Sequence, residues 1–335
     1  MVLVWRSRRH YRRFRTASGV NMRRLAALAA LALWATPLRA AAPPPEDPQA
    51  TVVADLVVRA KVGGPAWWKV TSGGASVWVL GVPAALPKGL KWDQSALARR
   101  LAASRRLILP PTASFGILDV FGAFSLGGKL RTRAPFEASL PPDLAQRFRA
   151  DASALSQSPS HYDRWKPAVA GLVMVADFRR RSGLDMGQPL AAIRGAAARA
   201  GVRAQPAASY PAIPMARSLA AELSPPVNLA CLADGLQEIE AGAGRVRAAA
   251  VAWAAGDVAG ALAAERGYER CLAALPDGAA LVRRTMADQT GAIAAALRTP
   301  GTTVAVVELR ALLAQGGVLD ALRARGYAVR TPAEE

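Results

Sequence analysis

Few side chains in this 335-residue chain have the chemistry to activate water or to hold a metal ion. It contains two histidines, His10 and His161, and no G-x-S-x-G motif, so the sequence does not support Ser–His–Asp catalysis. Asp119 and Glu308 are the two acids that fall near the ends of predicted strands. A metal site without histidine or clustered cysteine needs several converging carboxylates, and two are too few. The sequence therefore predicts neither a bound metal nor another cofactor.

The elements that position these residues begin with two β-prone runs, residues 67–72 and 75–80, around a Gly-Gly pair. Such a pair supplies the positive φ of a tight turn, so the runs predict a β-hairpin. The second run ends at Gly81, and the loop Val-Pro-Ala-Ala-Leu-Pro follows it. Loops at the ends of central strands are where α/β proteins usually place chemistry. This loop holds no side chain able to perform any.

The C-terminal end, like the N-terminal part, combines predicted strands with a helix. Residues 302–307 predict a β-branched strand, residues 311–325 a helix and residues 327–330 a last short strand. An Ala-rich, helical pattern fills about residues 141–298. We therefore expect an α/β (α+β) fold, in which N- and C-terminal strand-loop-helix units build a central mixed β-sheet and a large helical insert separates them.

The first 42 residues have the organisation of a secretory signal peptide. Nine arginines and no acid precede or flank a ten-residue apolar run at 25–34, and small residues at 40–42 suit cleavage. Met22 offers a later start, so residues 1–21 are a candidate mis-annotated start, and a twin-arginine signal is the alternative export route. We expect a periplasmic or secreted protein without a transmembrane anchor after cleavage, in which residues 43–62 form a Pro-rich tether and edge segment.

Removal of the leader lowers the formal charge from +19 to +10. The remaining arginines are scattered along Ala-rich helices and do not form basic blocks interleaved with aromatic residues, which argues against a nucleic-acid partner. Solvated helix faces are the simplest interpretation; attraction to an anionic membrane surface or polysaccharide is the alternative. Cys231 and Cys271 lie in two helical patterns, and in an oxidising compartment they are disulfide candidates, with two separate buried thiols as the alternative.

Several segments in order resemble the TraB/GumN family, whose eukaryotic relatives include the Tiki metalloproteases. The resemblance starts with Trp68-Lys69-Val70 and a strand that ends in Gly81, and it closes with Leu322-Arg323-Ala324-Arg325-Gly326-Tyr327. Matching segments are residues 68–70, 77–81, 86–89, 165–167, 183–185, 253–257, 304–307 and 317–327. The resemblance implies a family domain over residues 63–330.

The family is thought to depend on two Gly-x-x-His motifs and acids that hold a divalent metal and its activated water. The first motif position reads Gly81-Val82-Pro83-Ala84 here, and the second reads Glu308-Leu309-Arg310-Ala311. Ala84 and Ala311 therefore stand where the resemblance implies histidine. The acids that it implies after two further strands are absent from Pro110 and from residues 205–209.

We therefore expect a catalytically degenerate, exported protein that acts as a periplasmic binding or accessory protein. Its expected partner is a periplasmic protein, a peptide or an envelope polysaccharide. Asp119, Glu308 and Arg310 are the polar groups expected to remain in the former cleft. The alternative is a divergent metal-dependent hydrolase or peptidase that uses carboxylate ligands such as Asp119 and Glu308.

Overall fold

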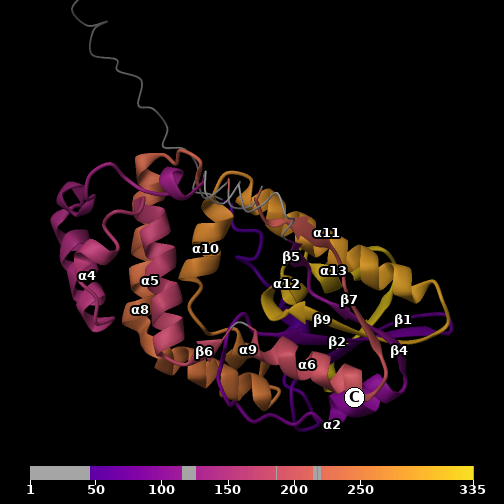
Figure 1. Ribbon diagram of the computed structural model, residues 1–335. Coiled ribbons are helices and arrows are strands. Elements are labelled where there is room, and N and C mark those ends of the chain that lie inside the picture. The colour runs from indigo at the N-terminus through magenta and orange to yellow at the C-terminus, as the bar shows by residue number, and fades with distance from the viewer. Residues whose placement is uncertain (1–45, 115–125, 186, 214–216, 218–219, 335) are drawn as a thin grey trace, which may run out of the picture. The chain divides into compact units, whose positions relative to one another are not determined.

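The computed structural model describes residues 46–114, 126–185, 187–213, 217 and 220–334 (Figure 1). Its main sheet has six strands among the described residues, in the order β10–β1–β2–β9–β4–β7. These strands are β1 (Trp67–Ser72), β2 (Ala75–Val82), β4 (Ser104–Leu109), β7 (Arg203–Pro206), β9 (Gly301–Glu308) and β10 (Ala328–Arg330). Strands from both ends of the chain lie next to one another, which confirms the predicted central sheet.

The sheet is mixed. Strand β2 pairs in parallel with β9, β9 with β4, and β4 with β7, whereas β1 is antiparallel to β2 and β10. The carboxyl ends of the four parallel strands therefore meet at one edge. Val82, the last residue of β2, is opposite Glu308, the last residue of β9. This register brings the two segments that follow these strands together.

The predicted hairpin is confirmed, because β1 and β2 pair in antiparallel register from Trp67–Leu80 to Ser72–Ala75. Gly73 has a φ of +52° in the turn, a conformation that glycine adopts readily. Trp67 and Trp68 are buried in the core. Two small two-stranded sheets flank this arrangement: β3 (Leu86–Pro87) with β6 (Leu184–Asp185), and β5 (Thr112–Ser114) with β8 (Ser209–Pro211).

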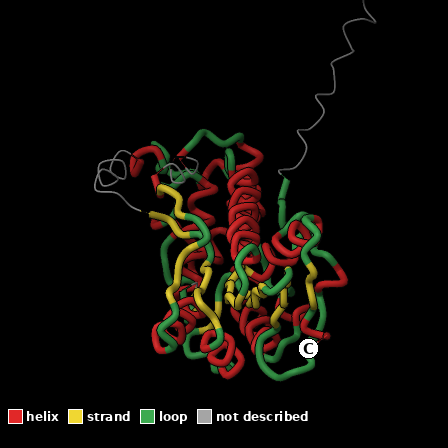
Figure 2. Tube along the Cα trace, turned by 90° about the vertical axis from the view of Figure 1, so that its right-hand side faces the viewer, coloured by secondary structure: helices red, strands yellow, loops and turns green. Residues whose placement is uncertain are grey.

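Helices cover both faces of the main sheet (Figures 1 and 2). Helices α2 (Ser95–Ala102) and α6 (Gln188–Arg199) lie below it in Figure 1. Helices α11 (Gly278–Leu297), α12 (Leu309–Leu313) and α13 (Val318–Ala324) lie above it. Leucines and valines of the strands and of these helices form one continuous apolar core.

A second group of helices stands beside the sheet and has an apolar core of its own. It comprises α4 (Pro142–Ala154), α5 (Pro167–Arg181), α8 (Pro225–Ala254) and α10 (Gly267–Ala274). Helix α9 (Val258–Ala261) follows α8 and packs Val258 and Ala261 into the core of the main sheet. Helices α5 and α8 are in backbone contact: a Cβ built on Gly235 would lie 2.9 Å from the carbonyl oxygen of Gly171. A disulfide between Cys231 and Cys271 joins α8 to α10, as the sequence predicted.

Two expectations need correction. The single helix expected over residues 311–325 is wrong: α12 ends at Leu313 and α13 begins at Val318. Gly316 between them has a φ of +67°, and a Cβ on Gly317 would lie 2.5 Å from the carbonyl oxygen of Ala311, so the chain turns where a helix cannot continue. The edge segment within residues 43–62 forms no extended strand; it makes two isolated bridges, from Val52 to Ala314 and from Arg59 to Asp257.

Single-turn 3-10 helices complete the described structure. They are η2 (Ala54–Leu56), η3 (Glu137–Ser139), η4 (Pro159–His161) and η5 (Pro332–Glu334). None of the helices in the described part of the chain combines the length and apolarity required to cross a membrane.

Candidate functional site

The ends of β2 and β9 open onto one cavity at the carboxyl edge of the sheet. Ala84 lines it from the segment after β2, and Glu308 and Arg310 line it from the junction of β9 with α12. The opposite wall comes from the helical group, which contributes Arg179 and Arg266 among others. The cavity measures about 70 Å³, enough for a few water molecules or a small polar group. Both segments of the degenerate motif therefore border the same space, although Ala311 itself is not among the lining residues.

Gly81 allows the two motif segments to come this close. A Cβ at Gly81 would lie 2.6 Å from Cδ1 of Leu309, so any larger residue would push α12 away from β2. The indole Nε1 of Trp253 on α8 donates a hydrogen bond of 2.7 Å to the Gly81 carbonyl oxygen. The glycine that the motif retains is therefore explained by packing and needs no ligand.

Glu308 caps the N-terminus of α12. Its Oε1 accepts a hydrogen bond from the backbone N–H of Arg310 at 3.0 Å, and its Oε2 accepts one from the N–H of Ala311 at 2.7 Å. Burial raises the pKa of the Glu308 carboxyl, and the two backbone donors act against that effect. Both oxygens are thus occupied by the helix that the residue begins.

Arg310 directs its guanidinium towards carbonyl groups. It donates to the Leu262 carbonyl oxygen at 3.0 Å and to the Gln49 carbonyl oxygen at 3.4 Å. Burial and the nearby charge of Arg266 lower the pKa of Arg310. Within the described residues Arg310 makes no ion pair, so it does not pair with Glu308.

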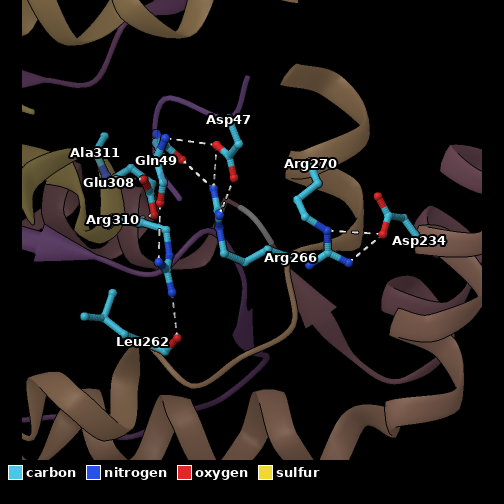
Figure 3. A network of polar contacts seen from close by, with 9 residues as sticks. All are labelled: Asp47, Gln49, Asp234, Leu262, Arg266, Arg270, Glu308, Arg310 and Ala311. Atoms are coloured by element: carbon cyan, nitrogen blue, oxygen red, sulfur yellow. Dashed lines mark hydrogen bonds and ion pairs between the residues drawn. The ribbon is translucent and has the colours of Figure 1, made fainter. Parts of the chain in front are cut away.

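Arg266 lies beside Arg310 and pairs with Asp47, near the start of the described chain (Figure 3). Its guanidinium contacts the Asp47 carboxylate at 2.6 and 3.4 Å and donates to the Gln49 side-chain oxygen at 3.1 Å. Only 15% of the Arg266 side chain and 16% of the Asp47 side chain are exposed. Burial would raise the pKa of Asp47, but hydrogen bonds from Arg266 and Gln49 and the charges of Arg266 and Arg310 together lower it.

The helical wall contributes a buried ionic cluster. Arg179 on α5 contacts Glu238 on α8 at 2.7 Å and Glu269 on α10 at 3.2 Å. The second oxygen of Glu238 accepts from the backbone N–H of Tyr268 at 3.1 Å. A guanidinium therefore supplies the positive charge between two carboxylates that both face the cavity.

Comparison with known protein families identifies the family to which this chain belongs. A model of the TraB/PrgY/gumN family matches residues 66–331. The chain belongs to the TraB/PrgY/gumN family. Searches among curated proteins and among solved structures found no match.

The residues of this TraB/PrgY/gumN domain do not fit the divalent metal that the family resemblance implies. Among the residues that the structure describes, no three His, Cys, Asp or Glu side chains converge closely enough to share an ion. Glu308 is bound to backbone donors, and Glu238 is bound to Arg179. A further lining acid, Glu265, pairs with Arg245 at 3.0 Å. Guanidinium groups therefore occupy carboxylates that a metal would require.

The structure distributes the remaining predicted residues as follows. Ala311 is buried beneath the cap of α12, and its backbone, not its side chain, contacts Glu308. Asp119 lies outside the described residues. His161 is half exposed at the surface of the helical group, with its Nε2 3.9 Å from Asp177.

Sequence reasoning missed the acidic partners of the cavity arginines. Glu238 and Glu269 belong to Ala-rich helices, where charges were interpreted as solvated faces. Asp47 belongs to a segment that was interpreted as a tether. The sequence does not single out Arg179, because it stands in a run of three arginines at the end of its helix; only its burial shows that it needs an acid nearby.

Proposed function

We propose that this chain is an exported, catalytically degenerate member of its family that acts as a periplasmic binding or accessory protein. One observation carries the proposal: the two motif segments border a single cavity and contribute a methyl group at Ala84 and a capped carboxylate at Glu308. The second histidine position, Ala311, is buried and is not among the lining residues. The paired strand ends are retained, whereas the metal ligands are not.

The chemistry of the cavity supports binding and argues against hydrolysis. A metal-dependent hydrolase needs an ion that lowers the pKa of water and polarises a carbonyl group. Here the cations are guanidinium groups, which stay protonated and donate hydrogen bonds in a fixed geometry. Arg179, Arg266 and Arg310 can orient a small polar molecule but cannot generate hydroxide. Alanines, two leucines, a valine and a proline supply the apolar remainder of the wall.

The export part of the proposal has separate support. The arginine-rich leader with its short apolar run has the pattern of a signal peptide. The disulfide between Cys231 and Cys271 is of a kind that persists in oxidising compartments such as the periplasm. These two features come from different parts of the chain and favour the same location.

Metal analysis of the protein purified from the periplasmic fraction tests the proposal. We expect zinc, manganese and cobalt far below one equivalent, and no peptide hydrolysis with or without added metal. A stoichiometric ion together with hydrolysis that a chelator abolishes would establish the alternative, a divergent metal-dependent hydrolase with carboxylate ligands. Recovery of the protein in the cytoplasmic fraction with its leader intact would contradict the export part alone.

A further inference from the structure

The N-terminal segment of the described chain lies across the cavity arginines. We call residues 46–50 the strap. We propose that Arg266 and Arg310 form a binding site for a small carboxylate- or phosphate-bearing anion, and that Asp47 of the strap is an internal occupant which such an anion displaces. The inference rests on the proposed binding function and assigns a ligand class to the same cavity.

The two arginines differ in their direct partners. Arg266 pairs with the Asp47 carboxylate, while Arg310 donates to the backbone carbonyls of Leu262 and Gln49. The two guanidinium groups lie close enough for Arg266 to lower the pKa of Arg310. The lining glutamates Glu308 and Glu269 favour the charged form of Arg310, but Glu308 is bound to backbone donors and Glu269 to Arg179. Asp47 is therefore the carboxylate that directly contacts this pair of arginines.

Asp47 demonstrates the geometry that the site accepts. Its two carboxylate oxygens contact two nitrogens of Arg266, at 2.6 and 3.4 Å, the paired arrangement that arginine forms with carboxylates and phosphates. The adjoining cavity of about 70 Å³ gives a small anion room beside Arg310. A ligand anion that takes the place of Asp47 on Arg266 and extends into this cavity would approach Arg310, which Asp47 itself does not contact.

The contacts of the strap allow it to leave without disturbing the core. Three of its side chains make polar contacts: Glu46 to Arg283 at 2.9 Å at the surface, Asp47 to Arg266, and Gln49 to Arg266. The Gln49 carbonyl also accepts from Arg310 at 3.4 Å. The next residues are anchored independently, because the Thr51 carbonyl accepts from Gln315 and the Val53 N–H donates to Leu313. Displacement of Asp47 therefore requires movement of about five residues, not unfolding of the domain.

Because the strap holds Asp47 next to Arg266, an external anion must compete with the Asp47 carboxylate for this site. A carboxylate held a few residues from its anchor has an effective concentration of roughly millimolar. A free anion in the native protein therefore competes at millimolar concentrations. Removal of the Asp47 carboxylate should strengthen anion binding at least tenfold, since the internal competitor is gone and the charge of Arg266 is uncompensated.

Isothermal titration with inorganic phosphate and with succinate, at constant ionic strength and neutral pH, tests the proposal. The variants are D47A and the matched control D55A. Asp55, eight residues after Asp47, also pairs with an arginine: it contacts Arg323 on α13 at 2.6 Å. It does not line the cavity. We expect D47A to bind one or both anions at least tenfold more tightly than the native protein, and D55A to match the native protein.

Two further variants establish that the arginines carry the binding. D47A/R310M should lose the gained affinity, and D47A/R310K, which keeps the charge but not the planar fork, should bind more weakly than D47A. Unfolding curves of each variant check that the fold is intact, and the lysine variant serves if the methionine variant does not fold. Equal affinities for D47A, D55A and the native protein, or a D47A gain that survives in D47A/R310K and D47A/R310M, would overturn the inference.

The outcomes separate this inference from the proposed function. A stoichiometric metal would refute the degenerate, non-catalytic function, and a D47A-dependent anion site would still stand beside it. A metal-free protein whose anion affinity ignores Asp47 and Arg310 would keep the proposed function and reject the assigned ligand class.

Discussion

Replacement of Asp151 by asparagine should remove a pH-dependent loss of stability. Asp151 lies on α4 and is 7% exposed, and its Oδ2 has no hydrogen-bond partner in the described part of the chain. Burial, and secondarily the charge of Glu240, raises the pKa of Asp151 to about 7, although Arg147 acts in the opposite direction. Arg147 is itself committed to Glu240 at 2.7 and 2.9 Å.

The sign follows from comparing the folded and unfolded states. The folded-state pKa of about 7 lies above the model-peptide value of 3.8, so between these pH values the folded protein retains a proton that the unfolded chain has lost. The free energy of unfolding therefore falls as pH rises through this window, by about 1.4 kcal/mol per pH unit. Between pH 5 and pH 8 the native protein should lose about 3 kcal/mol relative to D151N, which cannot ionise.

Urea denaturation at pH 5, 6, 7 and 8, followed by tryptophan fluorescence, measures this difference. D143N is the control, because Asp143 is an exposed acid on the same helix. We expect D143N to follow the pH dependence of the native protein and D151N to diverge from both above pH 5. Parallel profiles for all three proteins would refute the reasoning, since they would show that the Asp151 carboxyl titrates as it does in the unfolded chain.

Three further predictions concern stability. The C231S/C271S double variant should lose about 4 kcal/mol in the free energy of unfolding, because the disulfide closes a loop with a sequence separation of 40 residues; reduced native protein should match it in urea denaturation. G235A should lose about 1–3 kcal/mol, because its Cβ meets the backbone of the facing helix, whereas G291A, with open space around its Cβ, should not be destabilised in thermal denaturation. R179M should lose about 3–5 kcal/mol, because two carboxylates would be left without their buried partner; unchanged stability would contradict the ionic cluster.

The local parts of the fold could be predicted from the sequence. The hairpin of β1 and β2 depends on a β-prone run on each side of Gly73-Gly74, which are neighbours in the chain. The break between α12 and α13 was missed although Gly316-Gly317 is visible in the sequence. The apolar periodicity continues across these glycines, and only the close approach of Gly317 to Ala311 shows that the helix must stop.

The candidate site could be predicted only in part, because its polar contacts join residues that are far apart in the chain. The sequence located Ala84 and Glu308 at two strand ends, and the sheet register explains why they border one cavity. Asp47 and Arg266 are separated by 219 residues, and no local pattern connects them. A Pro-rich segment favours a tether on composition alone, and the polar contacts of Asp47 and Gln49 do not alter that composition.

The order of strands also bears on when the sheet can form. Strand β9 lies between β2 and β4, and its Thr302 lies opposite Ser76, 226 residues earlier. A ribosome must therefore finish almost the whole polypeptide before the centre of the sheet can close. Folds dominated by such distant pairings acquire their native state slowly. The proposed export would benefit from such a delay, because a chain that is still unfolded can pass through a translocation channel.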